Sequence, residues 1–481
     1  MKRILLLIIS LFLTVQTIKA QAVVLDTNGV TIKWTGTTVP SPYFIQANPR
    51  GTGMEWFAIV DDTTKSNITD YANNSQSGIT YFTPTDESSP IPFDNIVTTL
   101  VTNMSQMFAY VTAFNEPINS WDVSNVTNMN VMFYNAQDFN QPIGSWNVSN
   151  VTDMGAMLHT ATTFNQPIGS WNVSNVTAMD GMFYNAQDFN QPIGSWNVSN
   201  VTAMDGMFQR ASAFNQPIGS WNVSNVTAMD GMFYQATSFN QNIGSWIVGN
   251  VTSMNQMFVG ATSFNQPIGS WNVSNVSDMN GMFYHATSFN QNIGSWNVSN
   301  VTNMAFMFTA TAFNQNIGSW NVGNVSDMSG MFYTAQLSTA NYDDLLIGWS
   351  TIGPNESPLQ QNVTFSGGNS NYCNGETAQT SILNTYGWTI TDGGLDCSSL
   401  ETETFDAMGI KLYPNPVLNV LNVTTDYTLI NQPYTIIDGL GRVILKGKFN
   451  EVETAINVEQ LSKGIYYIKL SDNNASKFIK E

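Results

Sequence analysis

The stretch of chain that decides the fold spans residues 143–164 and reads IGSWNVSNVTDMGAMLHTATTF. Close copies of this stretch follow one another through the middle of the chain. Its tryptophan returns every 25 residues from Trp121 to Trp296, and Trp320 follows after 24. Such a fixed period indicates a repeat architecture, in which each unit buries its apolar side against its neighbours.

The first half of one unit has the spacing of a short strand. Trp146 and Val148 alternate with Ser145 and Asn147, so the apolar pair is expected to face inward and the polar pair outward. Stacked units would then form a parallel sheet with strands roughly 4.8 Å apart.

The second half of the unit has the spacing of a helical turn. Thr152 is suited to cap such a turn, and Met154, Met157 and Leu158 would share its inner face. Twenty of the 23 methionines form ten Met-x-x-Met pairs of this kind. The sequence therefore predicts a solenoid whose coils each contain a short parallel strand and a short helical turn.

A polar column also runs through the repeats, because an asparagine follows a phenylalanine in every unit. A buried amide needs hydrogen-bond partners, and a ladder to the backbone of the next coil would supply them. We favour this structural role over ligand binding. The members are Asn115, Asn140, Asn165, Asn190, Asn215, Asn240, Asn265, Asn290 and Asn314.

The repeat unit FNQPIGSWNVSNVT-x-M-x-x-MF resembles that of the BspA-like leucine-rich-repeat surface proteins. The resemblance covers about residues 95–350. It implies a right-handed solenoid at the cell surface, with adhesion or host-protein binding in some members of the family.

The two ends of the chain differ from the repeats. Lys2 and Arg3 precede an apolar run and Ala20, a pattern typical of a secretory signal peptide cleaved after Ala20. Strands are expected at 56–62 and 79–82 within an N-terminal cap. The predicted segments are a signal peptide (1–20), an N-terminal cap (21–95), the leucine-rich-repeat-like solenoid (96–350), a C-terminal cap (351–400), a linker (401–409) and a C-terminal domain (410–481). The only two cysteines, Cys373 and Cys397, are expected to form a disulfide in the C-terminal cap of this exported chain.

The C-terminal domain has its own motifs. Several short alternating strands in about 70 residues predict a small Ig-like β-sandwich. The segment resembles the type A C-terminal sorting domain of the type IX secretion system, found in Bacteroidetes. That resemblance implies passage across both membranes by the type IX machinery, and then attachment to the cell surface or release. The residues that carry it are Tyr413, Pro414, Asn415, Pro416, Gly441, Arg442, Gly464 and Tyr466.

Charge and motifs exclude several classes of function. The net charge of −19 argues against nucleic acid, and Arg210 is the only basic residue between Val101 and Ala340. We find no catalytic motif in the sequence and expect neither an enzyme nor a cofactor. His159 and His285 lie at different repeat positions and are interpreted as surface residues.

One acidic column offers a possible metal site. Asp180, Asp205 and Asp230 are followed at the same repeat position by Asn255 and Asn280. Carboxylates on successive coils could hold Ca²⁺. We favour the alternative that these acids stabilise the start of the helical turns, and we expect no metal.

The function we expect is binding or adhesion, through an uncharged polar ribbon on the concave face that contacts an extracellular protein or a glycan. The alternative is a structural surface-layer protein without a specific ligand. Ice binding through the regular polar ranks is disfavoured, because we recognise no threonine ladder. The expected ribbon residues are Ser145, Asn147, Ser170, Asn172, Ser195, Asn197, Ser220 and Asn222.

Overall fold

The computed structural model is mostly β, with few helices, and forms two compact units, Met1–Asp396 and Cys397–Glu481. The expected signal peptide (1–20) and linker (401–409) lie outside the described residues. The structure describes residues 22–351, 353, 357–398, 410–425, 429–438, 441–470 and 475–481.

The N-terminal part of the first unit is a small mixed α/β cap. One antiparallel pair joins β1 (Val23–Leu25) to β2 (Ile32–Trp34). A second sheet has the order β3-β4-β5, with β4 and β5 parallel. From β3 onward the elements of the cap are β3 (Phe44–Ala47), β4 (Glu55–Asp61), α2 (Ser66–Ala72), α3 (Gln76–Tyr81), the 3-10 turn η1 (Phe93–Asn95) and β5 (Ile96–Leu100).

The expected strand at 56–62 is confirmed by β4, but the one at 79–82 is wrong, because α3 occupies this segment. The side chain of Ser75 accepts a hydrogen bond from the Gly78 N–H and caps the helix. Ile79 and Phe82 lie three residues apart, a spacing that places them on one face of a helix but on opposite faces of a strand.

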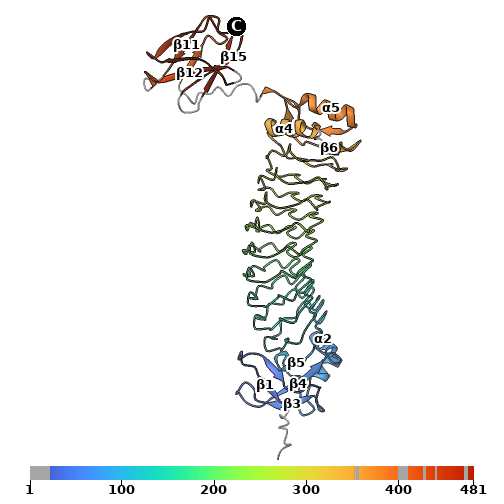
Figure 1. Ribbon diagram of the computed structural model, residues 1–481. Helices are drawn as coiled ribbons and strands as arrows, with labels where there is room; N and C mark the ends of the chain where they lie inside the picture. Colours follow the sequence, from blue (N-terminus) through green and yellow to red (C-terminus); the bar gives the residue numbers. More distant parts are fainter. Residues whose placement is uncertain are drawn as a thin grey trace, which may run out of the picture. The chain divides into compact units, whose positions relative to one another are not determined.

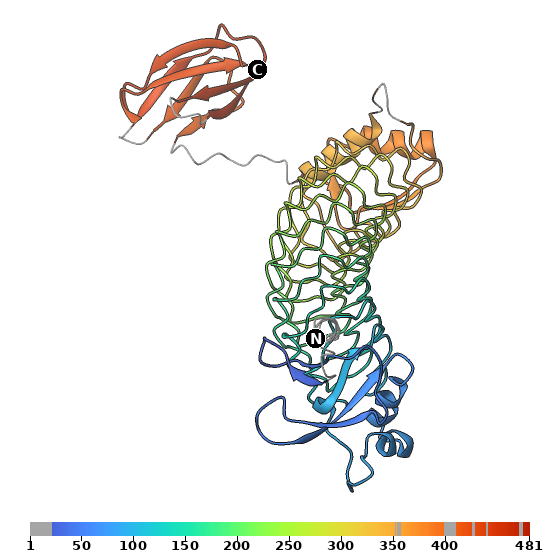
Figure 2. The same cartoon turned by 60° about the horizontal axis from the view of Figure 1, so that its bottom comes forward.

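Successive repeats form coils stacked in chain order from β5 to α4 (Thr339–Ser350), as Figures 1 and 2 both show. Neighbouring coils are joined by single parallel β-bridges rather than by strands. The bridged residues are Asn103, Asn128, Asp153, Ala178, Ala203, Ala228, Ser253, Asp278, Asn303 and Asp327.

The expected strand at Trp146 and Val148 is therefore wrong, since the bridges lie several residues further along each coil. The cause is a local turn: the backbone N–H of Trp146 donates to Ile143 O at 3.1 Å, which removes it from any ladder. The inward and outward alternation is nevertheless confirmed. Trp146 and Val148 are buried, while Ser145 and Asn147 are exposed.

The expected helical turns are also wrong, because each coil carries two left-handed residues where the helix would lie. Gly181 (φ 57°) and Asn185 (φ 54°) are one such pair. An α-helix requires negative φ throughout, so two such residues four positions apart exclude it. The N–H groups instead reach the next coil: that of Gly181 donates to Asp205 O at 2.8 Å.

The interior of the stack consists of columns of identical apolar side chains. The rings of Trp196 and Trp221 are parallel with centroids 6.5 Å apart, and Phe183 stacks on Phe189 of its own coil at 4.0 Å. From Trp146 to Trp320 each indole N–H donates to an isoleucine carbonyl of the preceding coil, as in Trp196 Nε1 to Ile168 O at 3.1 Å, whereas Trp121 Nε1 donates to Phe93 O of the N-terminal cap. Sequence reasoning did not find this bond.

The asparagine ladder is confirmed. Asn165 Oδ1 accepts from the Asn190 N–H at 3.0 Å and from Gln191 Nε2 at 2.8 Å. The ladder continues into the C-terminal cap, where Ser338 N and Asn341 Nδ2 donate to the last member. The C-terminal cap thus supplies Asn314 with the hydrogen-bond donors that a further coil would supply.

The C-terminal cap closes the other end of the stack. Trp349 of α4 donates its indole N–H to Ile317 O at 3.2 Å and so continues the tryptophan column. The disulfide between Cys373 and Cys397 is confirmed. The remaining elements are β6 (Thr364–Ser366), β7 (Asn371–Tyr372), α5 (Glu376–Tyr386), β8 (Thr389–Thr391) and β9 (Gly394–Leu395).

The second unit consists of two antiparallel sheets that share an apolar core. The sheets have the orders β10-β11-β14 and β13-β12-β15-β16. Leu421 of the first sheet and Ile436 of the second are both buried in this core. The strands are β10 (Lys411–Tyr413), β11 (Val420–Thr424), β12 (Pro433–Asp438), β13 (Val443–Lys448), β14 (Glu453–Asn457), β15 (Gly464–Lys469) and β16 (Ala475–Lys480).

Candidate functional site

A regular polar ribbon runs along the described coils, and most of these coils expose four polar side chains in it. In one coil they are Ser170, Asn172, Asn175 and Thr177, with Trp171, Val173 and Val176 buried between them. In the first coil Ser120 and Asp122 are buried, and the exposed Ile247 puts an apolar side chain in the ribbon. We call the equivalent positions of all coils the ribbon. The eight residues expected from the sequence to bind a ligand are all exposed and all lie in it.

Hydrogen bonds between coils hold most ribbon side chains in place. The Ser170 hydroxyl donates to Gly144 O at 3.0 Å, and Asn175 Nδ2 donates to Ser149 O at 2.7 Å. The Thr177 hydroxyl donates to Thr152 O at 3.1 Å. These side chains are therefore ordered before any ligand arrives.

The ribbon groups that remain available to a ligand after these hydrogen bonds are mainly acceptors. The hydroxyl donors of Ser170 and Thr177 and one amide N–H of Asn175 are bonded within the protein, so the oxygens of these side chains remain as acceptors. Asn172 is the exception: its Oδ1 accepts from Ser174 N at 3.2 Å, and its amide N–H groups have no acceptor in the described part of the chain. Most coils thus present several acceptors and the amide N–H groups of an Asn172-type residue, but Ile247 and Asp122 replace that asparagine in two coils.

The threonines form a ladder that the sequence analysis missed. Thr177 donates both its N–H and its hydroxyl to Thr152 O, and the same pair of bonds recurs along the stack. The expectation that threonine ladders are absent was wrong, because these threonines were assigned to helix caps. The column is Thr102, Thr127, Thr152, Thr177, Thr202, Thr227, Thr252, Ser277, Thr302 and Ser326.

At its C-terminal end the ribbon is bounded by helix α4 of the C-terminal cap. Ser295 and Ser319 of the last coils line a hollow of about 730 Å³, bounded by Asp344 and Ile347 of α4. The Asp344 carboxylate accepts from Asn316 Nδ2 at 2.7 Å. The hollow offers hydroxyl, amide and carboxylate groups beside one exposed apolar side chain.

The acidic column has a different role from the one expected. No helix begins there; instead Asp205 Oδ1 accepts from the Asp230 N–H at 3.0 Å, so the carboxylate bonds the backbone of the next coil. Burial raises the pKa of Asp205, and the nearby Asp230 and Asp180 carboxylates add to the rise. Within the described ranges, we find no group of three or more His, Cys, Asp or Glu residues placed to hold a metal ion.

His159 is not the free surface residue that was expected. Its ring is half-buried between Tyr134 and Tyr184, with centroids 4.3 and 4.1 Å away. Burial lowers the pKa of His159 to about 4, so the ring is neutral at pH 7. His285, by contrast, is exposed as expected.

The motifs of the C-terminal domain have structural partners. Asn415 Oδ1 accepts from the Ile479 N–H at 2.8 Å, which ties the segment after β10 to β16. Arg442 donates from Nε to Asp438 Oδ2 at 2.7 Å across a turn in which Gly441 has a φ of 78°. Tyr466 is buried, and its hydroxyl donates to Ser462 O at 3.0 Å.

Two further motif residues, Tyr413 and Gly464, lie at strand ends. Tyr413 ends β10, its hydroxyl donates to Glu453 of β14, and Pro414 and Pro416 flank Asn415 in the segment that follows. Gly464 begins β15.

Comparison with known families identifies both parts of the chain. The repeats match the family described as "Mycoplasma protein of unknown function, DUF285" over residues 80–180, 165–261 and 241–345. These matches together span more than half of the chain, so the protein belongs to this family. A comparison with curated proteins finds no match.

Residues 411–481 match the family described as "Secretion system C-terminal sorting domain". This domain implies interaction with the type IX secretion machinery, and export to the cell surface or secretion. In the part of the chain that the structure covers, none of the helices has the length and apolar character needed to cross a bilayer.

Proposed function

We propose that this protein is a binding protein of the cell surface, not an enzyme, whose ribbon holds an extended, hydroxyl-rich polymer such as a glycan chain. The stack is, on this proposal, a solenoid related to the BspA-like leucine-rich repeats, and the exported tail an Ig-like sandwich. The observation that carries the proposal is the ribbon: the same acceptors recur on successive coils, with an amide donor on most of them and Ile247 as the interruption, already ordered and almost without charge.

The chemistry of the ribbon selects the class of ligand. A surface of hydrogen-bond acceptors suits hydroxyl donors and offers little to an anion. An extended polymer can touch several coils at once, so weak contacts add through effective concentration rather than through one deep pocket. Because few ribbon groups are charged, salt should weaken binding only modestly.

The test compares two triple variants of the full chain on a glycan array and on a panel of immobilised extracellular matrix proteins. Asn147→Ala, Asn172→Ala and Asn197→Ala together remove three amide donors from adjacent ribbon coils. At about 0.5–1.5 kcal/mol per bond, affinity should fall at least about tenfold.

The matched control changes three positions of another column, sixteen residues after the tryptophans of adjacent coils. These positions are Gln137, Thr162 and Gln187, each changed to Ala. The control should bind as the wild type does. Equal loss in both variants contradicts the proposal, and so does the absence of any ligand, which favours a structural surface-layer role.

One observation favours a second candidate, the binding of ice. Asn175 and Thr177 form two exposed ranks on either side of the buried Val176, and inter-coil bonds fix both side chains. Such ranks could order water in a fixed lattice. Under this candidate the protein inhibits ice recrystallisation, and Thr202→Tyr, which breaks the rank, abolishes the effect; unimpeded crystal growth with wild-type protein rejects it.

A further inference from the structure

A second recess lies in the N-terminal cap and is made of residues outside the repeats. It has a volume of about 670 Å³ and is bounded by β3, β4, α3 and the loop that follows α3. That size is within the range of pockets that hold small ligands. The recess combines aromatic rings with a polar rim that carries one charged side chain, Glu87.

The aromatic wall comes from two neighbouring strands and the residue before them. Phe44 of β3 meets Trp56 of β4 edge to face, with centroids 6.2 Å apart at 77°. Tyr43 packs against Phe44 at 4.6 Å and against Tyr81 at 4.7 Å. Tyr43, Phe44 and Trp56 all rest against the main core, but each stays only half-buried.

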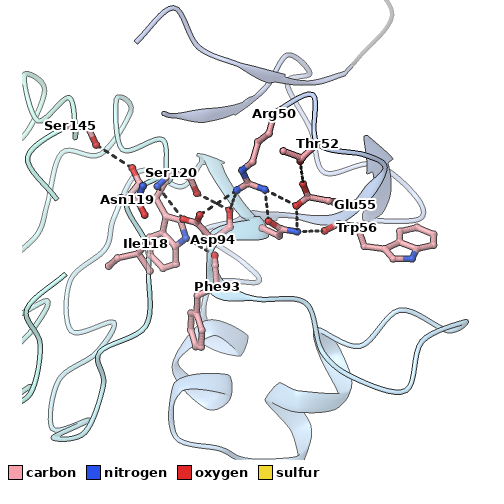
Figure 3. Close-up of polar contacts among 12 residues, drawn as sticks. Arg50, Thr52, Glu55, Trp56, Phe93, Asp94, Ile118, Asn119, Ser120 and Ser145 are labelled. Atoms are coloured by element: carbon pink, nitrogen blue, oxygen red, sulfur yellow. Dashed lines mark hydrogen bonds and ion pairs between the residues drawn. The ribbon is translucent and has the colours of Figure 1, made fainter. Parts of the chain in front are cut away.

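Polar contacts set the position of the Trp56 ring. Its Nε1 donates to Glu87 Oε1 at 3.3 Å, while its backbone carbonyl accepts from Asn95 Nδ2 at 3.0 Å. Asn95 belongs to a network with Arg50, whose Nη1 lies 2.8 Å from Glu55 Oε2. Figure 3 shows this network anchoring the backbone of Trp56 while its ring extends away from the network.

The rim of the recess supplies hydroxyl and amide groups. Gln76, Thr80, Thr85 and Ser88 line it and are exposed, and Glu87 is the only charged side chain among the described lining residues. With no cation there, an anionic ligand would meet no opposite charge. Half-exposed rings beside several hydroxyl groups suit a ligand that has both an apolar face and many hydroxyls.

From this arrangement we infer that the recess of the N-terminal cap binds a pyranose unit of a neutral glycan, with one sugar face on Trp56. The C–H groups of a pyranose face are slightly positive and match the negative face of an aromatic ring. The sugar hydroxyls would bond Glu87, Gln76 and the rim threonines. This site is separate from the ribbon and does not depend on the function proposed for it.

A quaternary ammonium group is the competing ligand, because aromatic rings with a nearby carboxylate also attract such cations. It has no hydroxyls with which to use the rim, so the observations favour the sugar. The two ligands can be separated at Glu87: Glu87→Gln keeps an acceptor for the Trp56 N–H but removes the negative charge.

The test is saturation-transfer NMR and calorimetry on the full chain. The probes are the methyl glycosides of glucose, galactose, mannose and N-acetylglucosamine, with choline as a separate arm. At least one glycoside should bind. Trp56→Ala should weaken this binding at least tenfold, Trp56→Phe should weaken it less, and Glu87→Gln should change it by no more than a few-fold.

Two controls separate this site from folding and from the ribbon. Met54→Ala removes a neighbouring exposed side chain outside the recess, and the triple ribbon variant at Asn147, Asn172 and Asn197 leaves the cap intact. Both should bind the glycoside as the wild type does, at an unchanged melting temperature. Binding of choline alone, binding of no glycoside, or equal binding by the Trp56→Ala and wild-type proteins would overturn the inference.

Discussion

Replacing Trp221 by alanine in the middle of the stack should destabilise the first unit strongly. The ring is 3% exposed and lies between the parallel rings of Trp196 and Trp246, each 6.5 Å away. Loss of burial and the cavity left behind together cost about 3–5 kcal/mol for such a residue. The buried bond from Trp221 Nε1 to Ile193 O at 3.1 Å adds about 1 kcal/mol.

The hydrogen bond adds no more than this, because Ile193 O also accepts the Trp196 N–H and is not left without a partner. Trp221→Phe keeps much of the packing and should cost less than Trp221→Ala. Asn222→Ser, on the exposed ribbon, should cost under about 0.5 kcal/mol. Urea unfolding followed by far-UV circular dichroism measures all three, and equal stabilities for Trp221→Ala and Asn222→Ser would refute the assigned inward and outward faces.

Four further changes test the packing of the coils and the cap. Val131→Gly should stabilise the protein by about 1–2 kcal/mol, seen as a higher urea midpoint, because Val131 has a φ of 60° and five other coils have glycine there. Asn190→Ala should cost about 1–3 kcal/mol in the same assay, since the Asn215 N–H loses its acceptor and Gln216 Nε2 keeps only Asn190 O. The pKa of His159 lies at about 4, below its unfolded value, so its contribution to the free energy of unfolding should be fully present above about pH 6.5 and be lost as the pH falls towards 4. After allowance for screening this loss is on the order of 1 kcal/mol, and His159→Tyr should remove the pH dependence. Changing Cys373 and Cys397 to Ser together should cost about 3–4 kcal/mol by chain entropy, and an unchanged melting transition would contradict this role of the disulfide.

The sequence predicts the buried columns well because a fixed period repeats the same burial in every coil. The inward position of Trp146 and the ladder through Asn165 both follow from it. The local backbone conformation, by contrast, is poorly predicted from the sequence. The turns contain residues in the left-handed conformation. At Gly181 the glycine itself indicates this conformation, but Val131 and Gln106 adopt it without any such signal in the sequence.

The ribbon could be predicted only in part. Alternation around Trp171 places Ser170 and Asn172 outside, but the threonine ladder was hidden because Thr177 has the position of a helix cap. The recess of the N-terminal cap gives no sequence signal. Its lining comes from three separate segments, with Tyr43, Trp56 and Glu87 far apart in the chain, and only the folded cap brings them together.

The central claim is that the ribbon binds its ligand over many coils, and the direct measurement is affinity against coil number. Deletion of residues 171–220 removes two whole 25-residue repeats, and deletion of residues 146–295 removes six. Both deletions leave the two caps in place. Calorimetry with the glycan or protein selected by the array screen should show affinity falling steeply from nine coils to seven and to three. If the three-coil protein binds that ligand as tightly as the full chain does, the ribbon is not the binding surface and the claim is wrong.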